Sequence, residues 1–236
     1  MAQDNQRKKL TQITTPLGVF RFPKLSDPDY GTEKFKKPDG EYSVQLVMKQ
    51  DSLVARQLIE TLNPHYQEAL AFAKEEFDKL PVGTRKKLKD IQPNPFYTTV
   101  YDKETEEPTG DIIFKATMKA SGVFKKGPKE GERWHRKPVI FDAKGNRMHR
   151  VPSIWGGTEG KIAVELTPYF VAGTGACGLK LSLAGVQIIK LVTANERSAS
   201  SLGFGAEEGY EYDASDVAEA DEAKDEAAAD VGEGNF

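Results

Sequence analysis

Short runs in which apolar and polar residues alternate recur along this chain, and they constrain its fold more than any other feature. Successive side chains of a β-strand point to opposite faces, so a period of two predicts a strand with one buried face. In the last run the apolar phase slips by one near Ala184 and Gly185, which predicts a β-bulge. The runs are PLGVFRF (16–22), EYSVQLVMK (41–49), PFYTTVY (95–101), DIIFKATMK (111–119), KPVIFD (137–142), KIAVELTPYF (161–170) and LKLSLAGVQIIKLV (179–192).

Residues 52–80 break this pattern, because their apolar residues recur at steps of three and four. Val54, Leu58 and Leu62 share one face of the helix that this spacing predicts. Asn63 followed by Pro64 suits an N-cap and a first helical position, so we predict two helices or one sharply kinked helix. Turn-forming and charged residues predict loops over 26–40, over 81–90 and around the segment 127–131.

Seven short strands and one helical insertion, with no alternation of strand and helix, favour a small antiparallel β-barrel or sandwich over a parallel α/β sheet. A chain of 236 residues suffices for one such domain with appendages. We place the domain at residues 1–192. Residues 193–236 are mostly small and acidic and cannot bury enough surface to offset the entropy of ordering, so they are predicted to be a disordered linker and acidic tail.

Charge is distributed unevenly along the chain, although the net charge is only −3. Residues 206–236 hold twelve Asp or Glu and one Lys, whereas residues 115–150 hold eleven Lys or Arg and three acids. A basic patch on the folded body is therefore joined to an acidic tail. Tethering gives such a tail an effective concentration on the order of millimolar, so we expect it to compete with DNA for the patch.

The basic stretch is interleaved with aromatic residues between positions 115 and 155. Phosphates require cations and unstacked bases require flat apolar platforms, and single-stranded nucleic acid presents both at once. We expect Phe141, inside PVIF, to belong to the core, and Trp134, among basic neighbours, to be exposed for contact. The candidate contacts in this stretch are Lys115, Lys119, Phe124, Lys125, Lys126, Arg133, Trp134, Arg136, Lys137, Arg147, Arg150 and Trp155.

Two motifs suggest other functions. GTGACG (173–178) matches the dinucleotide-binding fingerprint, but an alternating strand rather than a helix follows it, so we predict a loop between two strands. His135, Asp142 and His149 are spaced by seven and seven, and they make a metal-dependent nuclease the alternative function, although no rigid element holds them together. We expect a protein that is not an enzyme, with no metal and no cofactor.

The lone Cys177 excludes an intramolecular disulfide and fits a reducing compartment, so we expect it to fill space in the core. The sequence has no apolar run of ~18 residues and no signal-peptide core, so we expect neither a membrane span nor secretion.

Several longer stretches carry a family resemblance. They are DPDYG (27–31) before GEYSVQL (40–46), the helical insertion with EEF (75–77), the whole segment 151–192 and the final GNF. In order and spacing they resemble the single-stranded-DNA-binding proteins of T7-like bacteriophages. The resemblance implies an oligonucleotide/oligosaccharide-binding (OB) fold interrupted by a helix. It also implies sequence-nonspecific coating of single-stranded DNA in phage DNA replication, recombination and repair, together with strand annealing.

Particular residues take roles from this resemblance. Lys115 and Lys119 fall on the strand where the family has basic residues that contact DNA. Asp39 takes the place of a basic residue of the family, and we expect Lys36 and Lys37 to substitute for it.

The tail takes a partner-binding role from the same resemblance. Asp230, Glu233 and Phe236 are implied to contact the phage DNA polymerase and primase-helicase. A homodimer in the cytoplasm of an infected bacterial host is implied as well. An RNA-binding or annealing chaperone on the same barrel stays open as a second alternative, because aromatic platforms do not distinguish the two sugars well.

Overall fold

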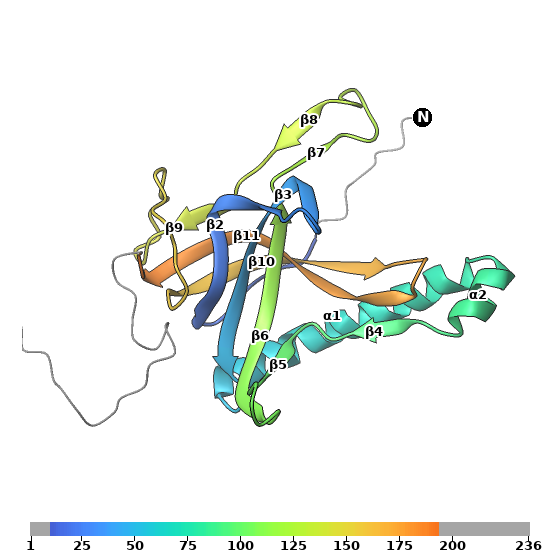
Figure 1. The fold of residues 1–236 in the computed structure, drawn as a ribbon, viewed down its shortest axis with the longest axis horizontal. Helices are drawn as coiled ribbons and strands as arrows, with labels where there is room; N and C mark the ends of the chain where they lie inside the picture. Colours follow the sequence, from blue (N-terminus) through green and yellow to red (C-terminus); the bar gives the residue numbers. More distant parts are fainter. Residues whose placement is uncertain (1–9, 194–236) are drawn as a thin grey trace, which may run out of the picture.

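The computed structural model describes residues 10–193. Two helices, α1 (Leu53–Asp78) and α2 (Val82–Leu88), follow the third strand. Figure 1 shows the arrangement of the elements. The strands are β1 (Gln12–Thr14), β2 (Gly18–Gly31), β3 (Lys36–Lys49), β4 (Gln92–Asn94), β5 (Thr98–Tyr101), β6 (Pro108–Lys119), β7 (Ser121–Val123), β8 (Arg133–His135), β9 (Val139–Phe141), β10 (Glu159–Phe170) and β11 (Ala176–Lys190).

Five long strands close into a barrel. β2 pairs with β3, β3 with β6, β6 with β11, β11 with β10, and β10 returns to β2. Only the β6–β11 pair in this circuit is parallel. A closed Greek-key barrel of five strands is the OB fold, so the prediction of a mainly β, OB-like barrel with a helical insertion is confirmed.

Every second side chain along the strands points inward, and these apolar side chains fill the barrel interior. Tyr42, Val44 and Leu46 of β3 and Ile112 and Phe114 of β6 are all buried, while their neighbours on the same strands point outward. The predicted bulge in β11 is confirmed, because β10 pairs across it with residues 183 and 185 and skips the residue between them. The first half of GTGACG lies in the loop that joins β10 to β11, as predicted, whereas Ala176, Cys177 and Gly178 already belong to β11.

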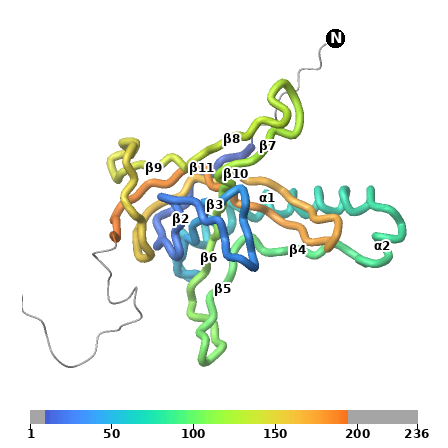
Figure 2. The backbone as a smooth tube through the Cα atoms, turned by 45° about the horizontal axis from the view of Figure 1, so that its top comes forward, coloured from blue at the N-terminus to red at the C-terminus, as the bar shows by residue number. Residues whose placement is uncertain are grey.

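The helical segment corrects two predictions. α1 continues through Pro64, so of the two alternatives predicted for this segment, the one with two separate helices is wrong. Buried Leu58 and Leu62 before the proline and Ala69 and Ala73 after it belong to one helix face, and their burial outweighs the hydrogen bond that a proline removes. Residues 82–88, predicted as loop, form α2. α1 lies along β10 and β11 (Figures 1 and 2).

The loop predicted over 26–40 is also largely strand. β2 extends to Gly31 and β3 begins at Lys36, which leaves only residues 32–35 as a turn. Three register shifts in the β2–β3 pairing interrupt the ladder where Pro23 and Pro28 cannot donate a hydrogen bond. The charged segment around residue 127 connects β7 to β8, and this hairpin projects from the barrel (Figure 1).

Cys177 is buried beside Ala73 and Ile91, which confirms its packing role. Burial raises the pKa of its thiol. Neither α1 nor α2 is long and apolar enough to cross a bilayer.

Candidate nucleic-acid interface

Cations and neutral polar side chains lie in register on the outer face of three adjacent barrel strands. Arg21 on β2 is opposite Gln45 on β3, which is opposite Lys115 on β6. At about 4.8 Å between neighbouring strands, this row spans about 10 Å. A second row, Lys24, Ser43 and Thr117, runs beside it. The barrel face is defined here as Arg21, Lys24, Ser43, Gln45, Lys115 and Thr117.

An exposed aromatic ring stands on the turn that joins β2 to β3, two of the strands that carry this face. Phe35 is 78% exposed at the tip of the β2–β3 turn and has Lys34 and Lys36 as chain neighbours. Thr32 and Phe35 close the turn with two backbone hydrogen bonds of 3.1 and 3.2 Å. Gly31 makes the turn possible, because it has a φ of +80° and a Cβ there would lie 2.0 Å from the Phe35 carbonyl oxygen. Such a ring can stack on an unpaired base while the neighbouring lysines attract its phosphate.

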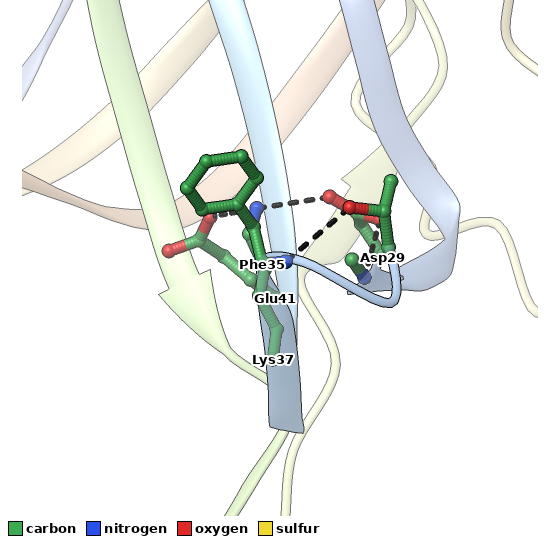
Figure 3. A network of polar contacts seen from close by, with 6 residues as sticks. Asp29, Phe35, Lys37 and Glu41 are labelled. Atoms are coloured by element: carbon green, nitrogen blue, oxygen red, sulfur yellow. Dashed lines mark hydrogen bonds and ion pairs between the residues drawn. The ribbon is translucent and has the colours of Figure 1, made fainter.

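Lys37, a predicted DNA contact, is held between two carboxylates. Its Nζ lies 2.9 Å from Asp29 Oδ2 and 2.8 Å from Glu41 Oε1 (Figure 3). The hydrogen bond from Lys37 lowers the pKa of Asp29, and those to Glu41 and Asp29 raise the pKa of Lys37. Lys37 therefore fastens β2 to β3 below the Phe35 turn, whereas Lys36 is exposed.

Asp39 joins the barrel to the β7–β8 hairpin. Its carboxylate lies 3.1 Å from Lys119 Nζ and 3.4 Å from Arg133 Nη2. The Lys119 hydrogen bond is the largest cause that lowers the pKa of Asp39. Arg136 donates from Nε to the Lys119 carbonyl oxygen at 2.9 Å. The structure thus brings three of the predicted cations together where the hairpin meets the barrel, namely Lys119, Arg133 and Arg136.

The Trp134 ring on the β7–β8 hairpin is less exposed than predicted. Trp134 is half-buried, and its indole lies against Gly122, where an added Cβ would be 2.5 Å from the ring. The Arg136 guanidinium carbon lies 5.0 Å from the Trp134 ring centroid. Phe124 is half-buried too, whereas Lys125, Lys126 and Lys137 are exposed.

The segment after β9 is a turn rather than a metal site. Asp142 accepts hydrogen bonds from the backbone of Lys144 and Asn146 and from the Asn146 side chain, and the Asn146 bonds lower its pKa most. Among residues 10–193, no three His, Cys, Asp or Glu side chains form a group that could hold a metal ion. His135, Asp142 and His149, the basis of the nuclease alternative, are therefore not assembled.

The other predicted residues near this turn are exposed or half-buried. Arg147 and Arg150 are exposed on the segment that follows the turn. Phe141, expected in the core, is half-buried. Asp230, Glu233 and Phe236 lie outside the described residues.

A groove lies beside the barrel face, between β2 and residues 153–156. Its volume is about 480 Å³, and Trp155 and Phe22 line it together with Lys24. Trp155 was a predicted contact. Phe22, Phe35, Arg21 and Lys24 were not, although the outward phase of Arg21 in PLGVFRF and the run KFKK were signals that pointed to two of them.

Comparisons with known proteins agree on one family. A family model described as the single-stranded DNA-binding protein of bacteriophage T7 matches residues 19–191. The single-stranded DNA-binding protein of Enterobacteria phage T3 is 30% identical over 171 residues, which are 72% of this chain and 71% of the T3 protein. The corresponding protein of Escherichia phage T7 is 29% identical over 184 residues, 77% of this chain and 76% of its own length.

The fold is similar to a solved structure as well. The crystal structure of gp2.5, a single-stranded DNA-binding protein encoded by bacteriophage T7, superposes with a TM-score of 0.62 and 28% identity. The match covers 79% of this chain and 97% of the gp2.5 chain.

Proposed function

Since the chain belongs to the bacteriophage T7 family of single-stranded DNA-binding proteins, we propose that it coats single-stranded DNA without base specificity along its barrel face. The observation that carries this proposal is the row Arg21, Gln45 and Lys115 on the outer face of β2, β3 and β6. β3 and β6 are the second and third barrel strands, and OB folds bind oligonucleotides on that face.

Low sequence specificity follows from the chemistry of this surface. Lysine and arginine attract the phosphates, which every sequence shares, and an aromatic ring stacks on any base. The observed binding constant should fall with salt, with a slope of about −0.7 in log–log form for each phosphate that a cation neutralises.

Paired substitutions test whether the barrel face binds the strand. The double variant Arg21→Ala/Lys115→Ala should weaken oligo-dT binding and flatten the salt slope by up to about 1.4, because two cations are lost. A matched control, Lys74→Ala/Lys86→Ala on α1 and α2, removes the same charge outside the face. Equal effects of the two variants would refute the assignment of the face.

The acidic tail adds a partner-binding role to this proposal. Twelve acids among residues 206–236 can imitate a phosphate chain, and Phe236 gives a partner an apolar anchor. The tail would recruit phage DNA polymerase and primase-helicase. Deletion of residues 206–236 should strengthen binding to single-stranded DNA and abolish recruitment, and unchanged DNA affinity would refute the competition. Phe236→Ala, with every acid kept, should lose the partner alone.

The remaining parts of the proposal have direct tests. We also propose, as the family resemblance implies, a homodimer that acts in replication, recombination and repair in the cytoplasm of the infected host and anneals complementary strands. Light scattering reports the oligomeric state. Labelled single-stranded DNA incubated with magnesium or manganese should stay intact, because the protein binds without catalysis. Oligo-dT should bind more tightly than oligo-U, and the reverse would favour the RNA-binding alternative.

A further inference from the structure

The groove between β2 and residues 153–156 has an apolar floor and an aromatic rim. Leu25, Ile154 and Val192 line the groove and are 3%, 7% and 8% exposed. Phe22 and Trp155, which also line it, are 65% and 37% exposed. Flat apolar surfaces at the mouth of a concave site suit a planar, apolar ligand group.

The walls of this groove are tied together by hydrogen bonds. The Ser26 hydroxyl donates to the Pro152 carbonyl oxygen at 2.8 Å, and the Gly157 amide donates to Phe20 at 2.9 Å. The Trp155 amide donates to Val192 at 3.1 Å, which holds the third wall. These bonds fix the walls relative to one another, so binding would require little ordering of the protein.

Phe22 reaches the rim through an unusual backbone conformation. Its φ is +48°, which is rare for a bulky residue, and Pro23 restricts it further. Regular alternation would place Phe22 on the same side as buried Phe20, but the ring is mostly exposed. The Arg21 guanidinium carbon lies 5.0 Å from the centroid of the ring. Backbone strain of this kind is concentrated at ligand-binding sites.

We infer that this groove binds one unstacked nucleobase of the bound strand, with Phe22 and Trp155 as its stacking surfaces. This inference rests on the proposed function and extends the path of the strand. Arg21 and Lys24 belong to the barrel face and lie on either side of Phe22 on β2. A single-stranded DNA that crosses β6, β3 and β2 therefore arrives at the groove. Lys24 holds the phosphate beside the inserted base. The groove lies beyond the β3–β6 face that OB folds use.

Fluorine NMR of the full chain labelled with 5-fluorotryptophan tests the inference. The chain has two tryptophans, and Trp155→Phe assigns their two resonances. The Trp155 resonance should shift on addition of oligo-dT. It should not shift with an abasic oligomer of the same length, which retains the phosphates and lacks the bases. Equal shifts with both oligomers, or none with oligo-dT bound, would overturn the inference.

Affinity measurements supply the second arm. Phe22→Ala should weaken oligo-dT binding by about 5- to 150-fold, which corresponds to the loss of one base stack of ~1–3 kcal/mol, and should leave binding of the abasic oligomer unchanged. Tyr101→Ala is the matched control, because Tyr101 is 59% exposed and does not line the groove. Equal oligo-dT affinities of Phe22→Ala and Tyr101→Ala would overturn the inference.

Three further outcomes separate the alternatives. If wild-type protein does not bind oligo-dT, the proposed function fails and this inference fails with it. If wild-type protein binds while Phe22→Ala binds equally well, the groove assignment alone fails. A Trp155 resonance that shifts with Phe236→Ala and not with oligo-dT would place the end of the chain in the groove instead.

Discussion

Replacing Asp39 by Asn should make DNA binding tighter and more dependent on salt. Asp39 holds Lys119 and Arg133 at 3.1 and 3.4 Å, next to the face that the strand is proposed to follow. A phosphate must displace this carboxylate to reach either cation. Asparagine keeps the size of the side chain and removes its charge, so both cations become available before DNA arrives.

The size of the effect follows from the number of cations released. Each cation that gains a phosphate steepens the log–log salt slope by about 0.7, so Asp39→Asn should steepen it by about 0.7 to 1.4. Over a rise from 50 to 200 mM salt, the advantage of the variant over wild type should then shrink by about 3- to 7-fold. Fluorescence anisotropy with labelled oligo-dT at four or five salt concentrations measures both quantities.

A matched variant separates this local effect from the general loss of negative charge. Asp111 pairs with Lys49 at 2.9 Å on the same two strands, at the opposite end of β6. It lies eight residues from Lys119, or roughly 26 Å along the strand, which exceeds two Debye lengths of about 10 Å at 0.1 M salt. Asp111→Asn should not release Lys119 or Arg133, so it should steepen the slope less than Asp39→Asn does. Equal slopes for the two variants would refute the reasoning, and weaker binding by Asp39→Asn would show that Asp39 positions the cations instead.

Three other substitutions test the supporting structure. Gly160→Ala should lower the free energy of unfolding by about 1–3 kcal/mol, since its Cβ would lie 2.5 Å from the Gln187 carbonyl oxygen and 2.6 Å from the Phe20 ring; an unchanged denaturation midpoint in urea would contradict this packing. Gly31→Ala should displace the Phe35 turn and weaken oligo-dT binding while the barrel stays folded, and wild-type affinity would show that the turn is not used. Asp29→Asn should destabilise the protein at pH 7, because the pKa of Asp29 is lowered in the fold, so its stabilisation is present above the unfolded-state pKa and disappears as pH falls through the folded-state pKa. Urea denaturation should show that the difference in unfolding free energy between wild type and Asp29→Asn is smaller at pH 3 than at pH 7. An equal difference at both pH values would contradict the Lys37 contact.

The alternation of apolar and polar residues predicted the strands well, because a strand with one buried face requires that alternation. The outward positions of Lys115 and Lys119 and the bulge near Ala184 all follow from it. The local pattern did not predict the positions of Phe22 and Pro64. A positive φ turns the Phe22 side chain to the opposite side of the strand, and core packing stabilises α1 on both sides of Pro64.

Long-range register explains the rest of what the sequence could not predict. Arg21 and Lys115 lie on strands far apart in the chain, and only the pairing of β2, β3 and β6 places them in one row. Lys37 and Lys119 were identified as cations, but their carboxylate partners depend on side-chain geometry.

Titration of the full chain with labelled oligo-dT at low salt tests the central claim most directly. The proposed function predicts tight binding that weakens steeply as salt is added, similar affinity for mixed-sequence single strands, and weaker binding to a duplex of the same length. The absence of binding to oligo-dT at low salt, or a preference for the duplex, would contradict it.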